Sequence, residues 1–331
     1  MAGAAGALRK RLASAAPRRQ HWHAAAGLGL RWLSSVQAPR SSAAPVNVVF
    51  VGGGKMAEAF ISGLQKTPSS FHVCGAVEIN KGRRDFLRGH YKVPVFESAA
   101  EAGGALFAAD LLVLAVKPQV ADEVMEDLSN VIKLGPRLEH TMTTVSILAG
   151  VPMERIRRGL DTESVCRAMP NTPAQAQAGM TVWTVTPSVT AARRKTLEKL
   201  FEAIGVGEYV SDENVLDAAT ALSGSGPAYF LMLLESMVDA AVHIGLSREL
   251  ANKLALQTMY GTAVHTQESP GKHHAELRND ITSPGGTTAF ALYQLERGGF
   301  RTTVSEAMWE SFKRSRELGQ KDVRVGPLSQ R

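Results

Sequence analysis

A chain of 331 residues, of which 44% are hydrophobic, is long enough to form two domains with buried cores. Its formal net charge is +6, but residues 1–45 hold seven Arg and Lys residues and no Asp or Glu. Those seven charges exceed the net charge and leave the rest of the chain at −1. The sequence therefore predicts no nucleic-acid-binding surface.

Residues 1–45 are rich in Ala, Ser and Arg, a composition typical of an organelle transit peptide. Arg and His interrupt the apolar residues, so neither a secretory signal nor a membrane span is predicted. Residues 31–35, Arg-Trp-Leu-Ser-Ser, resemble a mitochondrial processing site. We expect a location in the mitochondrial matrix. A plastid address and a disordered basic tail are the alternatives.

Short apolar runs alternate with amphipathic segments from residue 46 to residue 211. Five runs have the length and β-branched composition of strands, namely 46–51, 73–77, 110–116, 141–145 and 164–169. Three intervening segments are typical of helices, namely 56–65, 119–132 and 190–204. This order predicts an α/β fold with a mostly parallel, doubly wound sheet.

The composition changes after Asp212, where Ala, Leu and Met dominate and strand-like runs disappear. Residues 225–246 are apolar around most of a helical circumference, so this helix must be covered on all sides. A small helical domain rarely encloses such a helix alone. We expect a second subunit to cover it.

The first strand-like run leads directly into a glycine-rich turn and a helix. Gly52, Gly54 and Ala57 form the pattern G-x-G-x-x-A. The first glycine permits the turn, the second lets a pyrophosphate approach the backbone, and the alanine allows close packing of helix and strand. At the first βα junction of an α/β domain, this pattern favours a dinucleotide site over a glycine turn without a ligand.

The second strand ends in residues that leave the choice of nicotinamide cofactor open. Glu78 follows Gly54 by 24 residues, close to the spacing of an acid that binds the ribose 2′-hydroxyl of NADH. Lys81, Arg83 and Arg84 come next and could hold the 2′-phosphate of NADPH, or form a solvated helix face.

Residues 115–118, Ala-Val-Lys-Pro, end another strand-like run. The carboxyl end of a parallel strand faces the crevice where a cofactor lies, so Lys117 is predicted to contact the cofactor. The alternative is a lysine exposed at the end of a strand.

No metal site is predicted. Cys74 and Cys166 lie in separate apolar runs, and the adjacent pair His273 and His274 has neither a nearby Cys nor an i,i+4 partner.

Three later segments give the chain a specific family resemblance. They are RAMPNTP at 167–173 followed by AGMT at 178–181, LSGSGPAY at 222–229, and ELRNDITSPGGTT at 276–288. Together with 52–57 and 115–118, they resemble the pyrroline-5-carboxylate reductases in order and spacing, from about residue 46 to about residue 318.

The resemblance implies both the fold and the reaction. A Rossmann-like domain at 46–211 would be followed by an all-helical dimerisation and substrate domain at 212–331. The chain would form a homodimer, and dimers of this family often assemble into larger rings. It would reduce pyrroline-5-carboxylate to proline with NADPH or NADH, the last step of proline biosynthesis.

The resemblance also implies a substrate loop. Pro284 and two glycines expose backbone N–H groups just before the helical run 287–296, which suits a carboxylate. The alternative from this segment alone is an ordinary capped helix start. The implied substrate-binding residues are Ser283, Gly285, Gly286, Thr287 and Thr288. Thr288 would also be the catalytic residue, through a hydrogen bond from its hydroxyl to the ring nitrogen.

The expected cofactor-binding residues come from four segments. They are Gly52, Gly53, Gly54, Lys55, Met56, Ala57, Glu78, Ala115, Val116, Lys117, Pro118, Asn171 and Pro173. Asn171 could instead be a turn residue between two prolines.

The alternatives are another imine reductase built on the same plan, a β-hydroxyacid dehydrogenase, and a nicotinamide-binding regulatory protein without catalysis. A β-hydroxyacid dehydrogenase would be expected to carry a catalytic lysine on the buried helix, and residues 225–246 contain none. A nicotinamide-binding regulatory protein that has lost catalysis would be expected to have lost residues of the substrate loop. Here the loop keeps Ser283, Gly285, Gly286 and Thr288.

Overall fold

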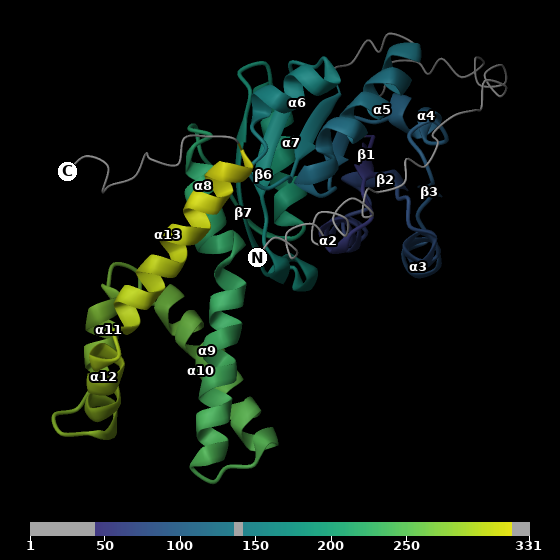
Figure 1. Cartoon of the computed structure of the whole chain (residues 1–331). Helices are drawn as coiled ribbons and strands as arrows, with labels where there is room; N and C mark the ends of the chain where they lie inside the picture. The colour runs from purple at the N-terminus through teal and green to yellow at the C-terminus, as the bar shows by residue number, and fades with distance from the viewer. Residues whose placement is uncertain (1–43, 136–141, 320–331) are drawn as a thin grey trace, which may run out of the picture. The chain divides into compact units, whose positions relative to one another are not determined.

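The computed structural model describes residues 44–135 and 142–319. The expected transit peptide, 1–45, therefore lies outside the described residues except for its last two positions. Figure 1 shows an α/β part followed by a group of helices that extends away from the sheet.

One eight-stranded sheet forms the α/β part, in the order β3-β2-β1-β4-β5-β6-β7-β8. Its strands are β1 (Val46–Val51), β2 (Phe71–Val77), β3 (Val95–Phe96), β4 (Leu111–Leu114), β5 (Thr143–Ser146), β6 (Val165–Met169), β7 (Gly179–Val185) and β8 (Gly205–Tyr209). All neighbours pair in parallel except β6 and β7. The expected α/β class and mostly parallel sheet are confirmed. β3, β7 and β8 were not among the expected strands.

Helices cover both faces of the sheet, as a doubly wound fold requires. They are α2 (Lys55–Leu64), α3 (Lys81–Tyr91), α4 (Gly103–Phe107), α5 (Ala121–Leu134), α6 (Met153–Leu160) and α7 (Ala191–Glu202). Short helical turns lie at η1 (Pro118–Val120) and η2 (Thr172–Ala176).

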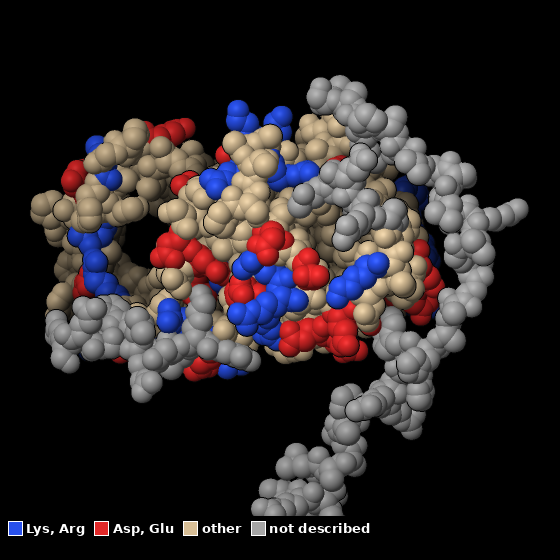
Figure 2. All heavy atoms as spheres, turned by 90° about the horizontal axis from the view of Figure 1, so that it is seen from above, with Lys and Arg blue, Asp and Glu red and all other residues tan. Residues whose placement is uncertain are grey.

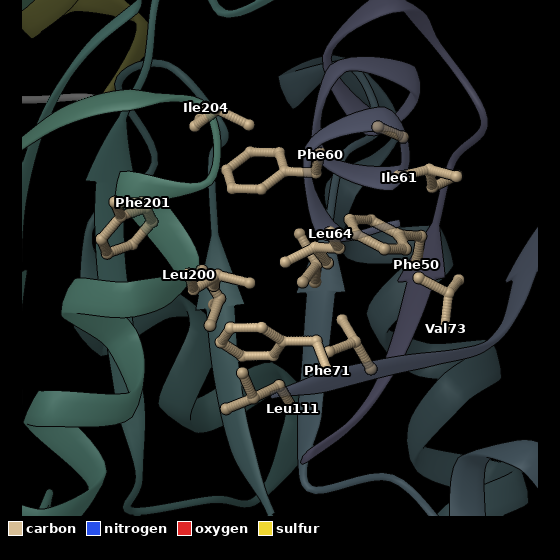
Figure 3. Close-up of a cluster of buried hydrophobic side chains, with 14 of the residues drawn as sticks. Phe50, Phe60, Ile61, Leu64, Phe71, Val73, Leu111, Leu200, Phe201 and Ile204 are labelled. Atoms are coloured by element: carbon tan, nitrogen blue, oxygen red, sulfur yellow. The ribbon is translucent and has the colours of Figure 1, made fainter. Parts of the chain in front are cut away.

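The hydrophobic core has two layers because successive strand residues point to opposite faces. On β1, Val48 and Phe50 belong to one layer, and Val49 and Val51 belong to the other. Figure 3 shows the first layer, where Phe60 of α2 and Phe201 of α7 approach the sheet. Burial of these apolar side chains against the sheet holds α2 in place directly after β1.

A second group of helices follows β8. They are α8 (Val215–Ala219), the π-helical turn η3 (Thr220–Gly224), α9 (Gly226–His243), α10 (Arg248–Gln267), α11 (His274–Asp280), α12 (Thr287–Arg297) and α13 (Phe300–Leu318). The expected all-helical segment is confirmed. α9 ends before the expected residue 246, because Gly245 takes a left-handed conformation with φ of +105°.

Two contacts organise these helices. α9 packs against α10 through Val238, Ala251 and Ala255. α13 packs against α8 and η3 at one end and against α12 at the other. In Figure 1, α13 runs from the sheet towards α11 and α12, which lie far from α2.

Charges of both signs share the face shown in Figure 2, where basic and acidic side chains alternate. Arg155 of α6 pairs with Asp122 of α5, and Arg157 of α6 pairs with Glu163 in the loop before β6. Within the described ranges, no helix is both long and apolar enough to cross a membrane.

Candidate active site

The four expected cofactor segments follow parallel strands of the same sheet. They come after β1 (Gly52–Ala57), β2 (Glu78), β4 (Ala115–Pro118) and β6 (Asn171 and Pro173). Because the carboxyl ends of parallel strands meet at one edge, the fold gathers these residues along that edge.

Gly52 is the point where two of these segments touch. Its φ is +96°, in the left-handed region that favours glycine. A Cβ atom here would lie 2.6 Å from the carbonyl oxygen of Ala115 and 3.0 Å from Cγ1 of Val116. The turn after β1 therefore rests directly on the residues after β4.

Gly54, unlike Gly52, lies in open space, since no described atom lies within 4 Å of a Cβ placed on it. It is the N-cap of α2, and among the described residues no side chain caps this helix. The first backbone N–H groups of a helix have no partner within the helix and attract anions. An open, glycine-capped helix start after the first strand fits a dinucleotide pyrophosphate.

The neighbours of Gly54 differ in exposure. Ala57 is fully buried against the sheet, which agrees with its expected packing role. Lys55 is exposed and lies 3.3 Å from Glu58, while Met56 is half-buried. Lys117 is exposed at the end of β4, and Ala115, Val116 and Pro118 are half-buried.

Glu78 is tied to the glycine turn by its carboxylate. Oε2 accepts a hydrogen bond from the Gly53 N–H at 2.8 Å, and Oε1 accepts one from the Asn80 N–H at 2.7 Å. The carboxylate therefore lies at the edge of the turn, where an acid that contacts the adenosine ribose is expected.

Glu58 and Arg83 join α2 to α3 beside this turn. Arg83 pairs with Glu58 and donates to the carbonyl oxygen of Gly53. Burial raises the pKa of the Glu58 carboxyl, but hydrogen bonds from Arg83 and Tyr91 outweigh burial and leave that pKa below its ordinary value. Sequence reasoning did not identify Glu58, since its partner lies 25 residues away.

Asn171 uses both ends of its side chain within the described chain. Nδ2 donates to the Ser223 carbonyl of η3 at 3.0 Å, and Oδ1 accepts from the Met180 N–H at 2.9 Å. Asn171 thus links the end of β6 to η3 and β7. Pro173 lies next to it in η2 and is half-buried.

The substrate loop leads into α12 through two glycines. Gly285 has φ of +71°, and Gly286 is the N-cap of α12. A Cβ on Gly286 would lie 2.3 Å from Oγ of Ser283, so the serine side chain folds closely over this glycine. In the described part of the chain, no side chain caps α12.

Two helices at the expected site thus begin with an uncapped glycine. Side chains cap α3, α7, α10 and α11, namely Asn80, Thr190, Ser247 and His273, whereas α13 also begins at an uncapped glycine, Gly299. The open starts of α2 and α12 have backbone N–H groups available for anions. One suits a pyrophosphate and the other a carboxylate.

The single chain does not bring these two anion sites together. α12 packs mainly against α13, and Ser283 and Thr287 are exposed, with Thr288 half-buried. Figure 1 places α12 far from α2 and β1. Within one chain, the residues expected to bind the cofactor therefore lie apart from those expected to bind the substrate.

A buried ionic cluster near the sheet was also not expected. Arg167 of β6 lies 3.1 Å from Asp217 of α8 and 2.8 Å from Glu213. Oγ of Ser315 on α13 donates to Asp217 at 3.3 Å. The bonded pairs of this cluster lie up to 98 residues apart in sequence, and a lone Arg in a strand gave no signal of its partners.

Two family models match the chain. The model "Pyrroline-5-carboxylate reductase dimerisation" matches residues 213–318, and the model "NADP oxidoreductase coenzyme F420-dependent" matches residues 47–150. A pyrroline-5-carboxylate reductase from Synechocystis is 39% identical over 278 residues, which cover 83% of this chain and 99% of that protein. This chain belongs to the pyrroline-5-carboxylate reductase family.

Further members of this family agree in length and fold. The reductase from Arabidopsis thaliana is 36% identical over 82% of this chain and 95% of its own length. The structure of the Coxiella burnetii reductase is 32% identical, with a TM-score of 0.72 over 82% of this chain and 98% of that one. A Plasmodium falciparum pyrroline carboxylate reductase with NADP bound is 27% identical, with a TM-score of 0.73 over 83% and 99%.

Proposed function

We propose that this chain reduces pyrroline-5-carboxylate to proline with NADPH or NADH. The observation that carries the proposal is the pair of open, glycine-capped helix starts at α2 and α12 in a member of this reductase family. Each start meets the charge of one reactant, the pyrophosphate of the dinucleotide or the carboxylate of the imine acid.

The reaction needs positioning more than acid–base chemistry. A bound reduced nicotinamide would supply a hydride to the carbon of a protonated C=N bond, whose electron pair would pass to nitrogen. In our proposal, Ser283 and the backbone amides of Gly286 and Thr287 hold the substrate carboxylate. The hydroxyl of Thr288 then orients the ring nitrogen.

We infer that the two halves of the site come from two subunits of a homodimer. Three observations support this. The substrate loop lies far from the cofactor turn within one chain (Figure 1), the helical part matches a dimerisation model, and α9 exposes large apolar side chains. Exposed apolar area of this extent favours association. A ring of such dimers is part of the proposal, and mass photometry would count its subunits.

An enzyme assay tests the reaction. Full-length protein is mixed with pyrroline-5-carboxylate and NADPH or NADH, and the loss of reduced-cofactor absorbance and the formation of proline are followed. Thr288→Ala should lower kcat by ~10–100-fold, and Thr288→Ser should restore most of it. Thr302→Ala, an exposed threonine of α13, is the matched control.

The outcomes separate clearly. Proline formation that depends on the Thr288 hydroxyl supports the proposal. Folded protein that binds a dinucleotide but forms no proline with either cofactor would contradict it, and would favour a regulatory protein that binds nicotinamide.

We also propose import into the mitochondrial matrix, on the acid-free, Arg-rich composition of residues 1–45. A fluorescent protein fused after residue 45 should enter mitochondria. Entry into plastids, or a diffuse distribution, would contradict the proposal.

A further inference from the structure

We propose that Glu78 makes this chain select NADH over NADPH. This inference rests on the proposed function, and in particular on the placement of the dinucleotide at the start of α2. NADPH differs from NADH only by a phosphate on the 2′-oxygen of the adenosine ribose. In this class of fold, the residues that follow the second strand meet that oxygen.

The first observation is that the Glu78 carboxylate is held in place. Its two oxygens each accept one backbone N–H, from Gly53 at 2.8 Å and from Asn80 at 2.7 Å. Gly53 has room for no side chain there, since a Cβ would lie 3.1 Å from Oε2 of Glu78 and 2.6 Å from Cδ1 of Leu87. The carboxylate therefore lies flat against the glycine turn.

A fixed carboxylate treats the two cofactors differently. Each oxygen keeps a lone pair that can accept a hydrogen bond from a ribose hydroxyl. A 2′-phosphate would instead bring negative charge against negative charge, with no proton to share. The backbone amides of Gly53 and Asn80 already donate to Glu78 and are not available to a phosphate.

The second observation concerns the cations that follow β2. Arg83 is paired with Glu58, and donates to the carbonyl oxygen of Gly53. Arg84 is buried, lies 2.8 Å from Glu97, and donates to the carbonyl oxygens of Glu78 and Ile79 at 3.0 and 2.7 Å. Both guanidinium groups thus have carboxylate partners within the chain, and a phosphate would have to compete with them.

The start of α3 gives a phosphate little further help. The Asn80 side chain caps this helix by accepting from the Arg83 N–H at 2.9 Å. Lys81 is exposed on the first turn, where a solvated ammonium group contributes little binding energy. The anchored carboxylate therefore outweighs the nearby cations.

Equilibrium binding to the full-length protein tests the proposal without relying on turnover. The dissociation constants of NADH and NADPH are measured by the fluorescence of the reduced nicotinamide. Those of ADP and 2′,5′-ADP are measured by calorimetry and isolate the effect of the 2′-phosphate. Wild type should bind NADH at least roughly tenfold more tightly than NADPH, and ADP more tightly than 2′,5′-ADP.

Two variants assign the effect to Glu78. Glu78→Gln removes the charge and keeps an acceptor for the Gly53 N–H, so the preference for NADH should fall by roughly tenfold or more. Asp85→Asn removes the same charge from an exposed side chain of α3 and should leave the preference unchanged. Melting temperatures of all three proteins show whether the turn is intact.

The possible failures are distinguishable. If wild type binds NADPH as tightly as NADH, or more tightly, this inference is overturned while the proposed reaction stands. The same holds if Asp85→Asn shifts the ratio as much as Glu78→Gln. If folded wild type binds none of the four nucleotides, the proposed cofactor site itself is wrong.

Discussion

Single residues at the glycine turn carry separate duties. Gly52 has a backbone conformation and a neighbour that exclude a side chain, whereas Gly54 has neither restriction. Gly52 therefore has a structural role, because it lets the turn after β1 pack closely against the residues after β4. Gly54 is expected to have a role in dinucleotide binding, because it leaves the start of α2 open.

Substitution by alanine should separate these duties. Gly52→Ala should destabilise the protein by about 1–3 kcal/mol, since it adds a Cβ 2.6 Å from the Ala115 carbonyl oxygen at a strained φ. Gly54→Ala should keep wild-type stability and weaken dinucleotide binding. Chemical denaturation and calorimetric titration measure the two effects. Equal loss of stability in both variants would contradict this assignment.

Glu58 should make stability depend on pH. Its pKa is lower in the folded protein than its ordinary value of 4.5, so it stabilises the fold above that pH. This contribution is lost as the pH falls through the folded pKa. Glu58→Gln should therefore lower the free energy of unfolding by about 1–2 kcal/mol at pH 7 and by much less near pH 3.

Denaturation with urea at several pH values checks this difference. Glu202→Gln, at an exposed position of α7, serves as the control and should show no such trend. A gap between Glu58→Gln and wild type that stays constant down to pH 3 would show that the effect is not the carboxylate charge.

At the scale of elements, a buried ionic cluster connects the sheet to the helices that follow it. Arg167 of β6 and Asp217 of α8 are both almost fully buried, and Ser315 brings in α13. Buried charges are costly unless they are paired, so the cluster fixes how α8 and α13 meet the sheet. Through α13, it also positions the segment that carries the substrate loop.

Breaking this cluster should be far more costly than breaking a surface pair. Asp217→Asn should destabilise the protein by about 3–5 kcal/mol, because it leaves Arg167 buried with one fewer charge partner. Asp122→Asn, which breaks the exposed pair with Arg155, should cost about 0–1 kcal/mol. Comparable losses in the two variants, measured by denaturation, would disprove the distinction.

At the scale of the whole molecule, the sheet has an extensive core, whereas the helical part has only a small one between α9 and α10. α9 leaves Phe230, Leu231 and Met232 between 61% and 71% exposed. α10 and α12 expose further large side chains, including Tyr260, Phe290 and Tyr293. An exposed apolar area of this kind favours burial against another protein surface. The match of residues 213–318 to a dimerisation model is consistent with a second copy of the chain as that surface.

A charge placed on α9 should separate the subunits. Met232→Glu should give monomers that still bind dinucleotide but do not form proline, since the substrate loop would come from the other subunit. Ser236→Glu, at an exposed polar position of the same helix, tests whether any charge on α9 has this effect. Analytical ultracentrifugation measures the mass. A fully active monomer would contradict the composite site.

The sequence by itself determined the fold class, the glycine turn and the family. Alternating strand and helix patterns, a glycine pattern at the first junction and motifs in fixed order are local properties, and local chemistry encodes them. The same holds for the all-helical segment after Asp212. The sequence did not predict β7 and β8, because pairing along the sheet, more than their own composition, makes them strands.

The tertiary structure decided the relations between distant residues. The anchoring of Glu78 by Gly53 and Asn80, the pairing of Arg83 and Arg84 with Glu58 and Glu97, and the cluster around Arg167 depend on which segments the fold brings together. It also separates the substrate loop from the cofactor turn within one chain (Figure 1). Apart from the Glu78–Asn80 hydrogen bond, these pairs lie 13 to 98 residues apart, and spacing along a sequence does not encode them.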